Sequence, residues 1–341
     1  MIASLREPGI KTKANYKLIA VKRFIALFGK YISFSFKRPE FKVKVVPQLF
    51  IETTNFCMSK CAYCAYKYMQ RPKEHLAMDL FKKAVDDYVK IGGVDFAFCC
   101  TLGEPTCDPF LLERVEYIKK NQRIRSISLI TNLQNLHQFD IHEFINSGIT
   151  SFRVSAVLSG SEKYYEFFGV DLYSVFLRNL VLLLKENKKY HNKISIEIDI
   201  KPTNETKEDI INHPDFKLIN SLTGQDLIAK VEAINYFVDD WCNMVHLPRY
   251  LKRRPLYPRF FQPCVLLADS VIVFSNGNVG VCQCRDYNAD SELILGNLKE
   301  KGLRELIDGD KRPRIFLEWK NRNKIPKICQ CCSQYIYRWQ N

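Results

Sequence analysis

The chain has 341 residues, of which 47% are hydrophobic and 26% charged, and it carries a formal net charge of +14. This composition is that of a globular protein and excludes a disordered or fibrous chain. The first 45 residues hold eleven Lys or Arg and only two Glu, so the rest is mildly basic, which argues against a broad nucleic-acid-binding groove. No uncharged apolar stretch reaches the roughly 18 residues of a membrane-spanning helix, which argues against an integral membrane protein.

Thirteen cysteines are the most unusual feature of the composition. No secretory signal is recognisable, because Lys17, Lys22, Arg23 and Lys30 interrupt the first apolar segments and no small-residue cleavage site follows. We therefore expect a cytoplasmic protein. In that compartment, clustered thiols bind metal or do chemistry more often than they form a disulfide scaffold.

The first predicted element is an amphipathic helix over Asn15–Arg38, within a basic segment spanning residues 1–44. Its apolar residues recur every three or four positions, with Lys and Arg between them. One interpretation is a helix packed on the main domain with a solvated basic face. The second is peripheral contact with an anionic membrane surface, and the third is contact with nucleic acid.

Strands and helices alternate after residue 43, which predicts βαβ units and a parallel sheet. A plausible Asp cap, Asp79, starts the first of the helices. The predicted strands are Leu49–Thr53, Val94–Cys100, Ile124–Thr131, Ser151–Val157 and Ile194–Ile200. The predicted helices are Asp79–Ile91, the region Pro109–Lys120, Ile141–Asn146 and Tyr173–Asn187. Functional residues in such sheets lie at the carboxyl ends of the strands.

The pattern fades near Tyr236, and the basic, proline-rich stretch Arg249–Pro263 reads as a linker. The following region, Cys264–Cys332, is rich in cysteine and contains a hairpin candidate around Ser275-Asn276-Gly277. We expect it to form a second, smaller domain.

Three cysteines, Cys57, Cys61 and Cys64, lie on a loop directly after the first predicted strand. Zinc sites normally use four ligands, and no fourth ligand is obvious nearby. A 4Fe–4S cluster takes one ligand per iron, so three cysteines leave one iron open for another molecule.

The spacing Cys57-x3-Cys61-x2-Cys64, with the aromatic Tyr63 before the third cysteine, resembles the signature of radical S-adenosylmethionine (radical SAM) enzymes. The resemblance implies that these cysteines hold a 4Fe–4S cluster whose open iron binds the amino and carboxylate groups of S-adenosylmethionine. Electron transfer from the cluster then yields a 5′-deoxyadenosyl radical. Tyr63 would lie against the adenine. A structural zinc knuckle is the alternative.

Other strand ends agree with this resemblance. A Gly-Glu-Pro sequence after the second strand is similar to the family's Gly-Gly-Glu-Pro motif near the cofactor's amino group, although Leu102 replaces the first glycine. Polar residues ending the third and fourth strands are similar to family positions near the ribose and carboxylate. The alternative is a polar strand end bonded only to backbone. The residues with this implied role are Gly103, Glu104, Thr131, Asn132 and Ser155.

The carboxyl-terminal cysteines resemble the SPASM/twitch extension of the same enzymes. Twelve residues separate Cys264 from Gly277, and four residues separate Gly277 from Cys282. The resemblance implies one auxiliary 4Fe–4S cluster, with Cys284 and Cys331 spare and able to replace a neighbour. A four-cysteine zinc site has similar spacing. The four implied ligands are Cys264, Cys282, Cys329 and Cys332.

The sequence thus predicts an α/β fold: a partial (β/α)6 TIM-like barrel with a small cysteine-rich SPASM/twitch domain. The predicted boundaries are 1–44 for the basic segment, 45–248 for the radical SAM core, and 249–341 for the linker and auxiliary domain.

The function implied by the resemblance is hydrogen abstraction from an unactivated C–H bond of a small polar metabolite, such as a sugar or aminocyclitol, with net oxidation or epimerisation. As a hypothesis, Cys242 returns a hydrogen atom to the substrate, the alternative being a buried cysteine. Modification of a ribosomally made peptide is the second possibility, and a non-catalytic iron–sulfur or zinc module is the third. A low-potential donor such as flavodoxin or ferredoxin is the implied partner, and no nucleic acid is expected.

Overall fold

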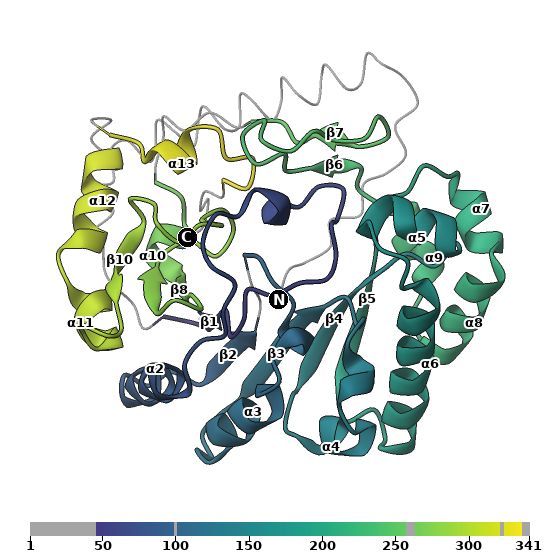
Figure 1. Ribbon diagram of the computed structural model, residues 1–341, viewed down its shortest axis with the longest axis horizontal. Helices are drawn as coiled ribbons and strands as arrows, with labels where there is room; N and C mark the ends of the chain where they lie inside the picture. Colours follow the sequence, from purple (N-terminus) through teal and green to yellow (C-terminus); the bar gives the residue numbers. More distant parts are fainter. Residues whose placement is uncertain (1–45, 99–100, 257–262, 321–323, 336–341) are drawn as a thin grey trace, which may run out of the picture. The chain divides into compact units, whose positions relative to one another are not determined.

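The computed structural model describes residues 46–98, 101–256, 263–320 and 324–335 (Figure 1). The predicted helix Asn15–Arg38 lies outside these residues, as do Cys99 and Cys100. Packing, membrane contact and nucleic-acid contact of that helix therefore stay predictions.

An eight-stranded sheet with the order β10-β9-β8-β1-β2-β3-β4-β5 forms the centre of the fold (Figure 1). Strands β1 to β5 run parallel and lie side by side in chain order, as the alternating pattern predicts. They are β1 (Leu49–Ile51), β2 (Asp95–Phe98), β3 (Ser126–Thr131), β4 (Ser151–Ala156) and β5 (Ser195–Ile200).

The helices between these strands include the four that the sequence predicts. The first, α2, begins at Met78 with Ala77 at its N-cap, so Asp79 is not the cap. Asp79 lies in the first turn, where its negative charge interacts favourably with the positive end of the helix dipole. The α-helices of the core are α2 (Met78–Lys90), α3 (Leu111–Lys119), α4 (Ile141–Asn146), α5 (Ser161–Phe168), α6 (Tyr173–Lys189), α7 (Lys207–Asn212), α8 (Pro214–Thr223) and α9 (Leu227–Glu232). Three 3-10 helices are η1 (Ala65–Tyr68), η2 (Pro105–Cys107) and η3 (Leu136–Gln138).

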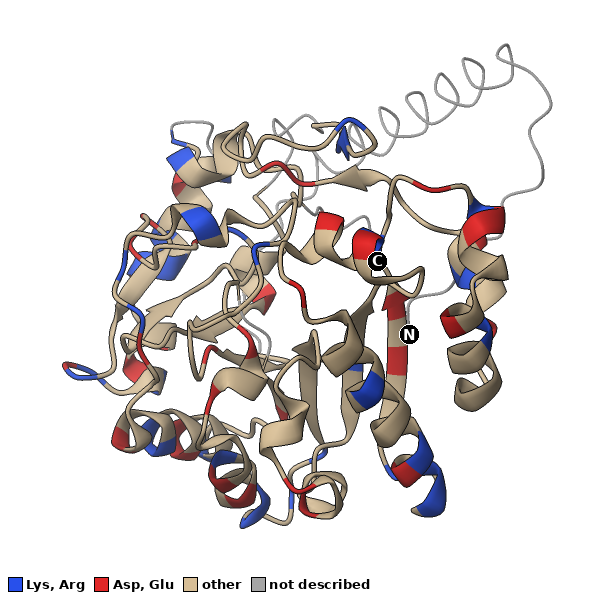
Figure 2. Cartoon of the chain, turned by 45° about the vertical axis from the view of Figure 1, so that its right-hand side comes forward, with Lys and Arg blue, Asp and Glu red and all other residues tan. Residues whose placement is uncertain are grey.

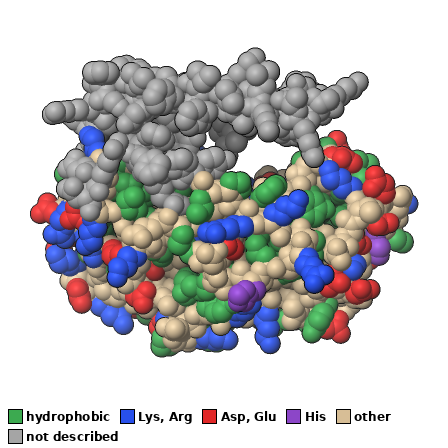
Figure 3. All heavy atoms as spheres, turned by 90° about the horizontal axis from the view of Figure 1, so that it is seen from above, with side chains coloured by type: hydrophobic (Ala, Val, Ile, Leu, Met, Phe, Trp, Pro, Cys, Tyr) green, Lys and Arg blue, Asp and Glu red, His purple; other side chains and the backbone are tan. Residues whose placement is uncertain are grey.

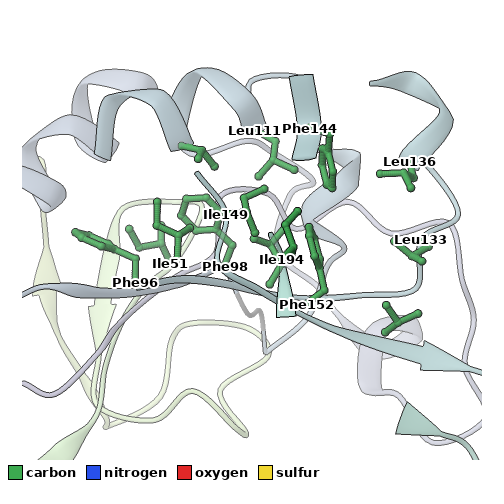
Figure 4. Packing of buried hydrophobic residues seen from close by; sticks show 14 of the residues in the cluster. Ile51, Phe96, Phe98, Leu111, Leu133, Leu136, Phe144, Ile149, Phe152 and Ile194 are labelled. Atoms are coloured by element: carbon green, nitrogen blue, oxygen red, sulfur yellow. The ribbon is translucent and has the colours of Figure 1, made fainter. Parts of the chain in front are cut away.

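The two faces of the parallel strands have different chemistry. One face packs its apolar side chains, such as Phe98 and Phe152, against helices that contribute Leu111 and Phe144 (Figure 4). On the other face, β3 to β5 carry partly exposed and mostly polar residues, because side chains alternate along a strand. The helices therefore cover one side of the sheet and leave a polar, concave side open, which is the arrangement of a partial barrel.

The sixth strand of the expected barrel does not join this sheet. β6 (Phe237–Val238) is only two residues long and pairs in parallel with β7 (Lys252–Arg253), inside the predicted linker. Among the described residues, the parallel core thus ends at β5.

The cysteine-rich segment extends the core sheet instead of forming a sheet of its own. β8 (Val271–Val273) runs parallel to β1, and β9 (Asn278–Gly280) turns back from it in the predicted hairpin. Gly277 occupies the turn with φ +84°, a conformation that favours glycine. The remaining elements are β10 (Ile294–Asn297), α10 (Leu266–Asp269), α11 (Leu303–Asp308), α12 (Lys311–Lys320) and α13 (Lys327–Gln330).

A buried ion pair joins this hairpin to the end of β1. The Glu52 carboxylate accepts hydrogen bonds from both terminal nitrogens of Arg71 at 2.5 and 2.6 Å. The backbone N–H and the hydroxyl of Ser275 donate to the same carboxylate at 3.1 and 2.9 Å. Because Glu52 is fully buried, Arg71 is the partner that keeps its charge compatible with the interior.

Charge is dispersed over the surface of the described residues. Lys, Arg, Asp and Glu alternate along the helices in Figure 2, and the face seen from above in Figure 3 mixes basic with hydrophobic side chains. No single described helix is long and apolar enough to cross a bilayer; α5 and α6 meet that test only when counted together, across a bend of 101°.

Candidate functional site

The loop after β1 brings Cys57, Cys61 and Cys64 together. Its backbone is anchored to the end of α5, since the N–H groups of Lys60 and Ala62 donate to the carbonyl groups of Phe168 and Phe167 at 2.7 and 2.8 Å. These bonds fix a loop that has little regular structure of its own.

Burial raises the pKa of all three thiols in this loop. Nearby negative charge raises it further for Cys57, through Glu104 and Cys61, and for Cys61, through Cys64. These charge effects of Cys61 and Cys64 agree with a loop that brings the three sulfurs near one another. The thiols therefore hold their protons until a metal displaces them.

Glu104 ties two strand ends to this loop. Its buried carboxylate accepts hydrogen bonds from the Thr131 hydroxyl at 2.6 Å, the Asn132 backbone N–H at 2.8 Å and the Thr106 hydroxyl at 2.8 Å. The Asn132 side-chain amide donates to the Ser59 hydroxyl at 3.3 Å. Burial raises the pKa of Glu104, whereas these hydrogen bonds lower it.

The structure thus gathers Glu104, Thr131 and Asn132 behind the cysteine loop. Thr131 and Asn132 are buried and support the loop through Glu104. Their direct contact with a cofactor stays a prediction.

Gly103 lies at a close approach between two loops. Its φ is +94°, and a Cβ atom there would lie 2.4 Å from the Thr54 carbonyl oxygen. Only glycine fits this position without moving the start of the cysteine loop. A side chain at position 103 would therefore disturb the cysteine loop, whether or not Gly103 itself contacts a cofactor.

A pocket of about 700 Å³ lies on the polar side of the sheet. Tyr63 from the cysteine loop lines it, and Ser155 lies on the same face of β4 as the pocket-lining Arg153. Burial raises the pKa of the Tyr63 hydroxyl, partly offset by the charge of Lys201. A volume of this size accommodates a small organic ligand.

Charged side chains of β4, of β5 and of Lys201 directly after β5 line the pocket in pairs. Arg153 Nε donates to Glu197 at 3.0 Å, and Lys201 Nζ donates to Asp199 at 2.7 Å. Burial alone would lower the pKa of Lys201, but Tyr63 and Asp199 outweigh it and raise the pKa, so Lys201 stays charged. The pocket therefore offers both hydrogen-bond donors and acceptors to a ligand.

These pocket residues were not predicted from the sequence. The pattern that indicates them is the alternation Ser-Ile-Glu-Ile-Asp-Ile of β5, which places acidic residues on one face of a strand within a parallel sheet. Strands buried on both faces are apolar throughout, so a polar face indicates a cavity beside the strand.

A second cavity is lined by five cysteines of the carboxyl-terminal segment. Burial raises the pKa of Cys282, and the charges of three neighbouring cysteines raise it further. Apolar side chains such as Leu267 and Trp319 complete the wall. The five are the predicted ligands Cys264, Cys282, Cys329 and Cys332, together with Cys284.

Both cysteine groups fit an iron–sulfur cluster. In the part of the chain that the structure describes, no three His, Cys, Asp or Glu side chains lie close enough to hold a single metal ion. A 4Fe–4S cluster does not require such convergence, because each thiolate binds a different iron. Three partly buried thiols in one loop and five cysteines around one cavity are suitable ligand sets for it.

Cys284 has a special place among these cysteines. It lines the cavity and also the pocket of about 700 Å³, as does Gln334. The segment from Cys282 to Cys284 is therefore the shared wall between the two sites.

The hypothesis that Cys242 donates a hydrogen atom is wrong for this structure. Cys242 forms a disulfide with Cys331, with 5.2 Å between their Cα atoms, and a disulfide sulfur carries no hydrogen. Neither residue lines the pocket or the cysteine-lined cavity. Of the two cysteines predicted as spare, Cys284 lines the cavity of the predicted ligands and Cys331 does not.

A polar pocket between two cysteine-rich sites, on the open side of a partial barrel, defines an iron–sulfur enzyme of the α/β class. Comparison with protein-family models identifies the family. Residues 51–213 match the radical SAM superfamily, and residues 264–333 match the SPASM iron–sulfur cluster-binding domain. The chain belongs to the radical SAM superfamily and carries a SPASM domain. The first domain binds S-adenosylmethionine and a 4Fe–4S cluster, and the second binds auxiliary iron–sulfur clusters.

Solved structures with a similar fold cover most of the chain. BtrN in complex with AdoMet and 2-DOIA has a TM-score of 0.56 and 16% identity, covering 85% of this chain and 94% of BtrN. SuiB from Streptococcus suis bound to the precursor peptide SuiA has a TM-score of 0.54 and 14% identity, covering 98% of this chain and 78% of SuiB. These similarities confirm the predicted fold class.

A curated relative matches a shorter part of the chain. GTP 3′,8-cyclase from Pasteurella multocida (strain Pm70) is 27% identical over 133 residues, which are 38% of this chain and 39% of the cyclase. The chain thus matches well under half of this relative's length.

Proposed function

We propose that this protein uses S-adenosylmethionine to oxidise a C–H bond of a small polar metabolite, such as a sugar or aminocyclitol. The observation that carries the proposal is the pocket of about 700 Å³, which Tyr63 lines from the cysteine loop and Cys284 lines from the auxiliary segment. BtrN, which was solved with AdoMet and 2-DOIA, supports a substrate of this size through its similar fold.

The residues of the pocket suit a polyhydroxylated or amino-substituted substrate. When bound, the cluster and S-adenosylmethionine supply a radical that removes a hydrogen atom from carbon. Lys201 and Asp199 present a partly buried cation and its partner carboxylate, which orient hydroxyl or amino groups. Arg254 donates to Gln334 at 2.6 Å at the pocket wall, which helps to exclude water from a reactive site.

The shared wall favours oxidation as the outcome. A substrate radical that loses one more electron and one proton becomes an oxidised product. The auxiliary site is separated from the pocket by the segment Cys282 to Cys284, and a cluster held there would be near enough to accept that electron. Asp199 and Glu197 are carboxylates in the pocket that accept the proton.

The test is anaerobic turnover in D2O of the reconstituted protein, with reduced flavodoxin or ferredoxin as the proposed electron donor. A panel of sugars and aminocyclitols is screened for 5′-deoxyadenosine formed in proportion to product. Oxidation predicts a product lighter by two hydrogen atoms, without solvent deuterium at the reacting carbon. Absence of any product with this panel, together with turnover of a peptide, would support the peptide-modifying alternative instead.

Epimerisation is the second candidate, and one observation favours it: Cys284 is among the residues that line the pocket. A thiol hydrogen exchanges with solvent, so epimerisation through Cys284 would place one deuterium at the reacting carbon. The variant Cys284→Ser would then lose product formation but keep S-adenosylmethionine cleavage. An oxidase would show no deuterium in its product.

A further inference from the structure

Three consecutive residues after β6 have a left-handed backbone. Trp241, Cys242 and Asn243 have φ values of 54°, 63° and 64°. For residues with a Cβ atom, this conformation is costly and persists only where the surroundings hold it. Such strained turns concentrate at functional sites.

The carboxyl-terminal segment holds this turn in place. Cys242 is bonded covalently to Cys331. The buried Arg285 forms an ion pair with Asp239 and donates to the sulfur of Cys242 at 2.8 Å. Asp239 also accepts a hydrogen bond from the hydroxyl of Ser333 at 2.5 Å. The turn is thus fixed by residues that lie next to the auxiliary cavity in sequence.

The turn presents the indole of Trp241 to the cysteine loop. Its Nε1–H donates to the carbonyl oxygen of Tyr63 at 2.9 Å. The guanidinium of Arg285 lies 5.2 Å from the indole ring centre, and Tyr287 packs edge-on at 5.9 Å. Trp241 and Tyr63 line the same pocket.

We propose that Trp241 is a positioning residue for S-adenosylmethionine. Its N–H group fixes the main chain of Tyr63 between the cluster ligands Cys61 and Cys64, and the SPASM segment fixes Trp241 through Arg285 and Cys331. The auxiliary domain therefore helps to form the cofactor site of the core, whichever substrate the enzyme uses.

The test is the variant Trp241→Phe, which keeps an aromatic ring and removes only the N–H donor. The dissociation constant for S-adenosylmethionine is measured on anaerobic, reconstituted protein by calorimetry. The loss of one neutral hydrogen bond predicts a dissociation constant about 3- to 10-fold higher. The paramagnetic resonance change that S-adenosylmethionine causes in the reduced cluster should need a correspondingly higher concentration, with iron content unchanged.

The matched control is Tyr287→Leu, which removes the edge-on ring and leaves the Trp241 N–H bond to Tyr63. It should bind S-adenosylmethionine within about twofold of the wild type. Equal weakening in both variants would overturn the proposal, because packing and not the hydrogen bond would then be responsible. Wild-type affinity in Trp241→Phe, or loss of iron from it, would overturn it as well.

A second arm tests how the turn is held and decides the matter if Trp241→Phe does not fold. Replacing Cys242 and Cys331 together by serine removes the covalent link and leaves the indole in the chain. A raised dissociation constant with full iron content supports the proposal. Wild-type affinity in this double variant would overturn it.

Discussion

The buried pair of Glu52 and Arg71 gives the sharpest prediction about stability. In Arg71→Met, Glu52 remains fully buried beside Ser275 but loses its cation. Removing one partner of a buried ion pair costs about 3–5 kcal/mol, because the remaining charge is uncompensated. The side chains of Glu52 and Arg71 are 0% and 6% exposed, so solvent screening does not reduce this figure.

The loss should depend on pH with a defined sign. Burial raises the pKa of Glu52 above its model-peptide value, and Arg71 counteracts that effect. Without Arg71 the pKa rises further, so the folded protein binds a proton that the unfolded chain releases near pH 4.5. The destabilisation should therefore be complete above the raised pKa, shrink as the pH falls through it, and disappear only near pH 4.5, where the unfolded chain also takes up the proton.

The assay is urea unfolding followed by circular dichroism under anaerobic conditions at pH 6, 7 and 8. Lys301→Met is the control, because its partner Glu305 and Lys301 itself are more than half exposed, and water screens such a surface pair, so the variant should unfold at the same urea concentration as the wild type. The double variant Glu52→Gln with Arg71→Met should recover most of the loss. A cost below about 1 kcal/mol for Arg71→Met, or no recovery in the double variant, would refute the reasoning.

Three further predictions concern the cysteines. Replacing Cys57, Cys61 and Cys64 by alanine should lower the iron content from about eight to about four per chain and abolish 5′-deoxyadenosine formation. Cys282→Ser should lose the auxiliary cluster while Cys284→Ser keeps about eight irons; the reverse result would make Cys284 the ligand. In metal-free protein, the raised pKa values of the three loop thiols predict a slow reaction with iodoacetamide at pH 7. The reaction rate should increase about tenfold from pH 7 to pH 8, because the thiolate is the reactive form. A rate that does not change with pH would contradict this prediction.

Local patterns in the sequence predicted the parallel strands well. Stretches such as Ser151–Ala156 alternate strongly between buried apolar and polar residues, and each of these strands pairs with the next one along the chain. The cysteine-rich loop could also be predicted from a local pattern, because its ligands, from Cys57 to Cys64, are close in sequence.

Contacts between distant segments could not be predicted in this way. Nothing near Cys242 indicates that it pairs with Cys331, since the two are 89 residues apart. The role of Arg285 likewise depends on Asp239, which is 46 residues away. Such pairs form only when the whole sheet brings its loops together, and a pattern read along the chain does not contain that information.

The pairing of β1 with β8 has a consequence for biosynthesis. Leu49 finds its partner Val271 more than 200 residues later, so the apolar strand Leu49–Ile51 emerges from the ribosome long before its second neighbour. Among the described residues, β8 is the strand that pairs with this side of β1, so until it is made that side is open to pairing with other chains. A nascent or truncated chain that ends before Val271 therefore lacks this pairing, and synthesis of the iron–sulfur extension supplies it.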